Sequence, residues 1–380
     1  MIPLRLRTFL HGLAASVTML ALHVAGADDG FVPLFNGRDL SGWVNVNCAA
    51  ETFTVVDGMI HCDGVPTGAL RTARQYENFE LELEWRHLKE GGNAGVFVWA
   101  GPLPAPGQPF LRAIEVQVLD HGYGKSDWFT THGDVFPIHG SSMKPFSPNR
   151  GDRSFPKEMR SKGAPEWNHY RIVATNGVLR LSVNGAEVSG GTDCRWRKGY
   201  LALESEGGHV DWRNLRIREL PSTGAGPADS APEAEPWRSL YDGRGLRGWT
   251  PSPTDAGAWK AQDWNLVSVA GARESAVLRG PACTGASRFF LDWKWEAAPA
   301  AKRPPLALEI GPGATVVAMP VLEKARVDGW NRIELQRAGD GFDLRLNGEP
   351  AGHVAAPAGD FTPVLVPPST VVHVASPFAL

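Results

Sequence analysis

The chain carries the same series of motifs twice. FNGRDLSGW at 35–43 matches YDGRGLRGW at 241–249, and Trp167-Asn168 matches Trp330-Asn331, each pair being followed by Asn-Gly. The offset between matching residues falls from 206 positions at the first motif to 163 at the second. Two homologous domains are therefore expected, the second shorter by 43 residues. Most of the loss falls opposite the polar stretch 112–163, where we expect the chemistry.

Four segments follow from this comparison. Residues 1–27 combine two arginines, an apolar run and the small residues Ala25-Gly26-Ala27, which predicts a secretory signal cleaved after Ala27. The alternative is a retained membrane anchor. The first domain is expected over 28–220, a flexible linker without large apolar residues over 221–236, and the degenerate second repeat over 237–380. We expect a secreted or periplasmic protein with no stable membrane anchor after cleavage.

Composition and periodicity favour an all-β protein. The net charge of −3 and the lack of a long basic run give little support for nucleic-acid binding. Uninterrupted alternation over 79–85 and 170–183, the latter around an Asn176-Gly177 turn, predicts half-buried antiparallel strands. No convincing helical period accompanies 43 Gly and 30 Pro. A large two-sheet sandwich is expected, followed by a truncated copy of it.

Two cysteines bracket a predicted hairpin. Cys48 and Cys62 flank two short strands joined by Asp57-Gly58, which is typical of a tight turn. Because an exported protein meets an oxidising compartment, we expect a Cys48–Cys62 disulfide.

The strand at 115–120 is a candidate site element. Glu115 and Gln117 would share one face while the intervening valines face the core, and Asp120 would begin the next loop. Glu204 and Glu206 lie two apart and would likewise share a face, so three carboxylates are available for acid and base roles. The alternative for Glu115 is an ordinary solvated face.

The stretch 121–146 adds histidines and aromatic residues. His132 and His139 are candidates for proton transfer near neutral pH. Together with Asp134 they could instead hold a divalent metal ion, and the sequence leaves a metal requirement open. The alternative is a purely structural role, in which this stretch is a long loop folded on its own aromatic residues.

Six motifs in the first domain resemble the bacterial 3-keto-disaccharide hydrolase domain family. They are FNGRDLSGW, ENFELELEWR, GGNAGVFVWAG, EVQVLD, the WNHYRI and SVNG pair, and LESEGGHVDWRNLRIREL. The resemblance covers roughly residues 31–220 and implies a concanavalin A-like jelly roll and an exported enzyme that acts on oxidised sugars. The second copy keeps only the framework motifs, which suggests a structural or carbohydrate-binding repeat.

The chemistry of a 3-keto-glycoside suggests roles for these residues. A ketone at C3 makes the C2 proton acidic, so a base can remove it and the C1 oxygen can leave by β-elimination, after which water adds. We expect His132 or His139 as base, Glu115 or Glu206 as acid, and Lys144, Asn93 or a metal at the enolate oxygen. The remaining candidates for substrate binding are Trp99, Gln117, Asp120, Trp128 and Glu204. The alternative for Trp99 is a place in the core.

Two other functions stay open. A conventional retaining glycosidase on the same fold would hold two of the carboxylates about 5 Å apart. A non-catalytic lectin-like module would bind an oligosaccharide or glycoside without turnover.

Overall fold

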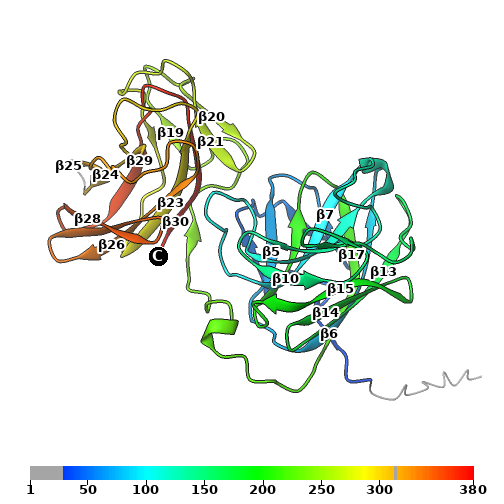
Figure 1. Ribbon diagram of the computed structural model, residues 1–380. Coiled ribbons are helices and arrows are strands. Elements are labelled where there is room, and N and C mark those ends of the chain that lie inside the picture. The colour runs from blue at the N-terminus through cyan, green and yellow to red at the C-terminus, as the bar shows by residue number, and fades with distance from the viewer. Residues whose placement is uncertain (1–28, 312–314) are drawn as a thin grey trace, which may run out of the picture.

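The computed structural model describes residues 29–311 and 315–380, which form two β-sandwiches (Figure 1). The predicted signal segment at 1–27 lies outside the described residues. The predicted fold class is confirmed, because each sandwich consists of two antiparallel sheets and the helical residues of the described chain are two single 3₁₀ turns, η1 (His121–Tyr123) and η2 (Pro227–Asp229). No described helix has the length and apolar character needed to cross a membrane.

The first sandwich packs a back sheet against a front sheet, with the main hydrophobic core between them. The back sheet runs, in spatial order, β10 (Ser142–Pro145), β15 (Ala186–Arg195), β14 (Val178–Val183), β13 (Asn168–Thr175), β6 (Phe79–His87), β17 (Val210–Glu219), β4 (Met59–Cys62) and β3 (Phe53–Val56), with β1 (Val32–Pro33) on β17. The front sheet runs β11 (Asn149–Arg150), β12 (Arg153–Ser154), β9 (Val135–Ile138), β8 (Ala113–Leu119), β7 (Asn93–Ala100), β16 (Tyr200–Ser205), β5 (Gly68–Thr72) and β2 (Trp43–Val46).

The second sandwich repeats this strand order. Its back sheet runs β28 (Glu349–Ala355), β27 (Gly341–Leu346), β26 (Asn331–Ala338), β23 (Arg288–Trp295), β30 (Val372–Ala379), β21 (Asn265–Ser268) and β20 (Trp259–Gln262), with β18 (Arg238–Ser239) on β30. Its front sheet runs β25 (Thr315–Ala318), β24 (Leu306–Ile310), β29 (Phe361–Leu365), β22 (Leu278–Arg279) and β19 (Thr250–Pro251). In its described part no strands correspond to β9 to β12, so the structural loss coincides with the polar stretch.

The predicted hairpin forms, but the predicted disulfide does not. Strands β3 and β4 pair around Asp57 and Gly58, both with positive φ, as the turn chemistry requires. The residue opposite Cys62 is Phe53, however, and Cys48 lies beyond the end of the hairpin. Both cysteines are buried free thiols, and the Cys48 Sγ donates to the carbonyl of Ala69 at 3.5 Å. The expectation was wrong because it placed the hairpin end at Cys48.

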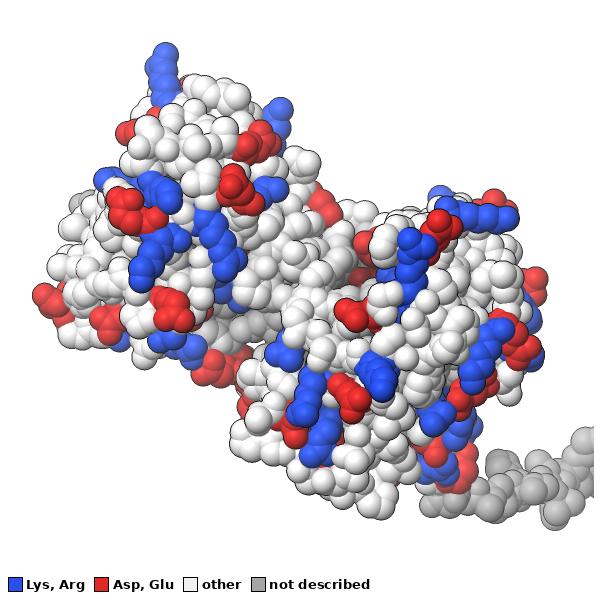
Figure 2. Space-filling view, in the orientation of Figure 1, with Lys and Arg blue, Asp and Glu red and all other residues white. Residues whose placement is uncertain are grey.

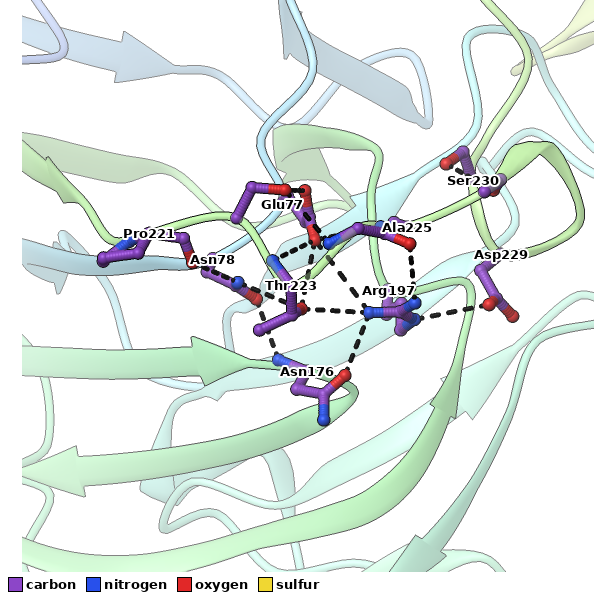
Figure 3. A network of polar contacts seen from close by, with 12 residues as sticks. Glu77, Asn78, Asn176, Arg197, Pro221, Thr223, Ala225, Asp229 and Ser230 are labelled. Carbon is purple, nitrogen blue, oxygen red and sulfur yellow. Dashed lines mark hydrogen bonds and ion pairs between the residues drawn. The ribbon is translucent and has the colours of Figure 1, made fainter.

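The segment predicted to be a flexible linker follows a fixed path along the first sandwich (Figure 3). The Glu77 carboxylate accepts hydrogen bonds from the backbone N–H groups of Thr223 and Ala225 at 2.9 and 3.1 Å. The Arg197 guanidinium donates to the Thr223 hydroxyl at 3.0 Å and contacts the Asp229 carboxylate at 3.4 Å. Composition predicted the lack of a core correctly, but polar partners elsewhere in the chain hold the segment in place.

A loop of the first sandwich docks onto the second. The backbone N–H of Gly107 donates to the Asp292 carboxylate at 2.8 Å, and Asp292 is fully buried. Arg332 donates to the same carboxylate at 2.7 and 2.8 Å and to the carbonyl of Pro104 at 3.0 Å. A Cβ on Gly107 would lie 2.3 Å from the Trp330 ring, so only glycine permits this approach.

Candidate active site

The candidate site lies on the outward face of the front sheet, over its central strands β7, β8 and β16. Side chains alternate along these strands, so Val96 and Val116 enter the core while their neighbours face outward. In the register, Glu115 lies opposite Phe97, and Gln117 lies opposite Gly95. This alternation brings the predicted polar residues of three strands onto one face.

These side chains enclose a cavity of about 230 Å³. It is lined by Asn93, Phe110, Glu115, Gln117, Leu119, Tyr123, Phe129, Phe136, His139, Arg153, Glu204 and Glu206. Three carboxyl groups, one imidazole and one guanidinium therefore share one small space.

Glu115 and Glu204 form the floor of the cavity on either side of Gly95. A Cβ on Gly95 would lie 2.9 Å from the Oε2 atom of Glu204 and 3.1 Å from the Oε1 atom of Glu115. Glu204 is 1% exposed and Glu115 is 6% exposed. The Oε2 atom of Glu204 has no hydrogen-bond partner among the described residues. The glycine thus provides the space in which two carboxyl groups meet.

Burial sets the protonation state of these acids. Burial, reinforced by the negative charge of Glu206, raises the pKa of Glu115 to about 8. Burial and the charge of Glu115 raise the pKa of Glu204 well above its ordinary value. Burial, with the charge of Asp263 from the second sandwich, raises the pKa of Glu206 to about 7. At neutral pH the cavity therefore holds carboxylic acids that can donate protons.

An amide chain orients Glu206. The Asn93 side-chain amide donates to the Glu206 carboxylate, and the Gln117 amide donates to the Asn93 carbonyl oxygen at 2.9 Å. Adjacent strands supply Asn93 and Gln117, and Glu206 directly follows β16. The predicted polar residues thus form one connected network.

Arg153 supplies the positive charge at the edge of the cavity. It donates to the Gln117 side chain at 3.3 Å and to the buried Asp134 carboxylate at 3.1 Å, and it lies over the Phe136 ring at 3.4 Å. Thr130 also donates to Asp134, so this carboxylate fixes the arginine. The sequence prediction missed Arg153. The only signal was its place in the polar stretch, because the short β11–β12 hairpin that carries it is recognisable only in the folded sheet.

His139 stands at the mouth of the cavity. Its ring stacks on Phe110, with centroids 5.8 Å apart and planes 15° apart. Burial lowers the pKa of His139, so the imidazole is neutral at pH 7 and can accept a proton. The aromatic residues of the cavity are phenylalanines and Tyr123.

Several predicted site residues lie elsewhere. His132 contacts the Ser161 hydroxyl at 3.0 Å and the His121 ring, outside the cavity lining. The Asp120 carboxylate accepts backbone hydrogen bonds from Gly91, Gly122 and Ala164, so it shapes loops.

The two tryptophan predictions and the lysine prediction also need correction. Trp99 is buried in the core, where its indole N–H donates to the carbonyl of Glu77 at 2.8 Å. Trp128 is 63% exposed and packs under Arg150. Lys144 lies exposed on β10, an edge strand of the back sheet. Neither tryptophan nor Lys144 lines the cavity.

The predicted metal ligands do not converge. Asp134 is occupied by Arg153 and Thr130, His132 faces Ser161, and His139 stacks on Phe110. Over residues 29–311 and 315–380 no group of three His, Cys, Asp or Glu side chains has a metal-binding arrangement. Loop spacing alone could not reveal that these residues point in different directions.

The equivalent face of the second sandwich has a different character. Strand β24 there corresponds to β7, β29 to β16 and β22 to β5. Glu309 on β24 is paired with Arg279 at 2.8 Å, and its neighbour on β29 is Thr362. The carboxylate of Glu309 is therefore paired with an arginine, unlike the buried Glu204 carboxyl group of the first sandwich, whose Oε2 has no partner among the described residues.

The domain that contains this cavity matches a known protein family. The sequence profile of the 3-keto-alpha-glucoside-1,2-lyase-like domain matches residues 30–218, which span the whole first sandwich and every residue lining the cavity. The first sandwich belongs to this family.

Relatives of this lyase-like domain are distant in sequence. A 3-keto-disaccharide hydrolase of Bacteroides thetaiotaomicron is 22% identical over 263 residues, covering 54% of this chain and 83% of the relative. A crystal structure of a candidate glycosyl hydrolase from Parabacteroides distasonis is 20% identical, with a TM-score of 0.37 over 50% of this chain and 94% of the other. A carbohydrate-binding module of Bacillus subtilis is 10% identical, with a TM-score of 0.34 over 47% and 96%.

Proposed function

We propose that the lyase-like domain cleaves the glycosidic bond of 3-keto-glycosides by removal of the C2 proton, β-elimination of the C1 oxygen and hydration of the enone. The observation that carries the proposal is the cavity content: a neutral imidazole, acids with raised pKa and a guanidinium within one buried space. The family membership and the name of the Bacteroides relative support the substrate class.

The first step is proton removal. His139 takes the C2 proton on a ring nitrogen, and the electron pair of the C2–H bond forms the C2=C3 enolate. Negative charge develops on the C3 oxygen, where the Arg153 guanidinium and the second N–H of the Asn93 amide are the available donors, since Gln117 already donates to Asn93 and to the carbonyl of Ala94. Fixed donors in a cavity with little water stabilise such a charge strongly.

The second step breaks the bond. The enolate re-forms the C3 carbonyl, a C1=C2 double bond forms, and the C1–O bond breaks. Glu115 gives its proton to the leaving oxygen, since its pKa of about 8 keeps it protonated at neutral pH. Water then adds to C1 and a proton returns to C2, which yields the free 3-keto sugar.

The experiment compares methyl 3-keto-α-glucoside with methyl α-glucoside, each with hydrogen or deuterium at C2. Cleavage of the keto compound alone, slowed by deuterium, supports elimination. Cleavage of both compounds without an isotope effect at C2 contradicts it. We also propose that the protein acts outside the cytoplasm, and N-terminal sequencing of exported protein tests this: a mature end at Asp28 is expected.

A retaining glycosidase is the second candidate. Oxygens of Glu204 and Glu115 lie within 2.9 and 3.1 Å of one point above Gly95, so their separation is compatible with an acid and nucleophile pair at about 5 Å. A 2-deoxy-2-fluoro glucoside with a good leaving group would then label one of these residues, which peptide mass spectrometry detects.

A further inference from the structure

A cleft of about 1120 Å³ lies between the two sandwiches. In Figure 2 the sandwiches are two lobes with a recess between them. Loop 101–106, Arg112 and Trp196 form the wall on the first sandwich, and Trp237, at the start of the second repeat, packs on the opposite wall. The opposite wall is the outward face of the second back sheet, with Phe290, Glu334 and Arg345.

The walls are held in a fixed relation. The buried Asp292 joins Gly107 to Arg332 at one end of the contact, and the Asp263 carboxylate accepts hydrogen bonds from the N–H and hydroxyl of Thr67, at 2.8 and 2.7 Å, at another. Glu77 and Arg197 anchor the first half of the connecting segment through Thr223, Ala225 and Asp229 (Figure 3). A ligand therefore meets a preformed cleft and does not have to order two mobile domains.

The cleft presents aromatic faces beside planar polar groups. The Arg112 guanidinium stacks over Trp196 at 3.9 Å, and Trp237 packs edge-on against Phe290 with centroids 5.0 Å apart. The Nε of Arg112 is buried and has no hydrogen-bond partner among the described residues. Aromatic side chains combined with an unsatisfied donor suit a sugar, whose apolar ring face is bordered by hydroxyl groups.

The cleft adjoins the catalytic cavity. His139 lines both spaces, so the two meet at the residue assigned as base. The cavity of about 230 Å³ is below the roughly 300–1,000 Å³ of a typical small-molecule pocket, so it accommodates little more than the reacting ring. A leaving group that extends past His139 from a ring bound there would enter the cleft.

We infer that the interdomain cleft is the subsite for the leaving-group side of the substrate, and that it binds further sugar residues of an oligosaccharide. The inference rests on the proposed function. The second sandwich then contributes to substrate binding through the outward face of its back sheet. This face completes the binding site of the first sandwich.

The test compares a short and a long substrate. Methyl 3-keto-α-glucoside fills the cavity only, whereas maltotriose oxidised at C3 of its non-reducing ring extends into the cleft. Trp237→Ala and Arg112→Gln are the cleft variants. Trp167→Ala is the matched control, because this half-buried tryptophan lies on the back sheet side between Arg86 and Arg213.

Both cleft variants should raise KM for the trisaccharide about three- to tenfold, the range expected for loss of one aromatic or polar contact, with kcat unchanged. Both cleft variants should turn over methyl 3-keto-α-glucoside at the wild-type rate. The control variant should show wild-type kinetics with both substrates. Equal effects on both substrates, or none on the trisaccharide, would overturn the inference.

A direct binding measurement separates this inference from the proposed function. If the wild type turns over no 3-keto compound, the proposed function fails, and maltopentaose binding followed by tryptophan fluorescence decides the role of the cleft. Binding weakened three- to tenfold in both cleft variants supports it. No binding, or binding unchanged in the variants, refutes it. Self-association of the wild type that both variants abolish would instead assign the cleft to a second copy of the chain.

Discussion

The Oε2 atom of Glu204 lies 2.9 Å from the point that a Cβ on Gly95 would occupy. A methyl group at this position would displace both carboxyl groups of the cavity floor, since the Glu115 Oε1 lies 3.1 Å from the same point. Gly95 has no positive φ, so alanine fits its backbone conformation without strain. Gly95 therefore leaves room for the two carboxyl groups, and a larger residue would fill that room.

Gly95→Ala should lower kcat/KM for methyl 3-keto-α-glucoside at least about tenfold, because misplaced catalytic groups lose alignment with the substrate. Thermal unfolding should change much less than activity. Gly226→Ala is the control: this glycine also has an ordinary φ, and nothing lies within 4 Å of its added Cβ. Full activity in Gly95→Ala would show that the carboxyl positions do not matter.

Glu115→Gln should slow the cleavage of substrates whose leaving group needs a proton much more than that of substrates whose leaving group does not. With a methoxide leaving group we expect a loss of about 10²–10⁴-fold, the range for a missing general acid, and with 4-nitrophenolate only a small loss. The wild-type rate should fall as pH rises through about 8, where Glu115 loses its proton. The variant should lack this alkaline decline. A similar loss for both leaving groups would assign Glu115 another role.

Glu204→Gln should stabilise the protein at alkaline pH. Because the folded-state pKa of Glu204 is raised above its ordinary 4.5, the stability that its proton confers is full below pH 4.5 and is lost as pH rises through the raised value. The gain over wild type should therefore grow as pH rises above 4.5 and level off once the buried carboxyl group has lost its proton. Denaturant unfolding at several pH values measures it. Glu309→Gln, which breaks a surface pair with Arg279, should give no such gain.

Arg153→Gln should reduce kcat/KM about 10²–10³-fold, the usual effect of removing one donor to a developing oxyanion. The loss should fall mainly on kcat, because the charge on the C3 oxygen develops only in the transition state. Arg150→Gln is the neighbouring control, since its side chain lies over the exposed Trp128 and outside the cavity. A change confined to KM would contradict the assigned role of Arg153.

Asp292→Ala should loosen the contact between the sandwiches. It leaves Arg332 without its buried partner and the Gly107 N–H without an acceptor, which costs about 3–5 kcal/mol. Glu82→Ala changes the equivalent position of the first sandwich, where partly exposed pairs with Arg216 and His169 predict less than about 1 kcal/mol. Denaturant unfolding gives both values. Equal losses would refute the docking role.

Local patterns predicted part of the site because they needed no long-range information. Strand alternation predicted that Glu115 and Gln117 share one face and that Glu204 and Glu206 share another, and the folded sheet brings both pairs to the cavity. Arg153 and Phe110 escaped prediction because their positions depend on a short hairpin and a loop that meet only in the folded sheet. His132 and His139 were equivalent in sequence, yet the chain between them turns so that only His139 reaches the cavity.

The cysteines and tryptophans show the same limit. The pairing of Cys62 depends on the register of its hairpin, which sets Phe53 opposite it and leaves Cys48 five residues away. Trp99 lies on a strand that also contributes to the cavity, but it faces the core. Composition alone could not show which face each tryptophan occupies.

The pair Asp292 and Arg332 occupies the positions that Glu82 and His169 hold in the first sandwich. In one copy the acidic and basic partners face water, and in the other they clasp a loop of the neighbouring domain. The two sandwiches thus keep the same strand order while this exterior position differs in its partners. Because Arg332 also lines the cleft between them, an outer face of the second sandwich can shape the surroundings of the first without any change in either core.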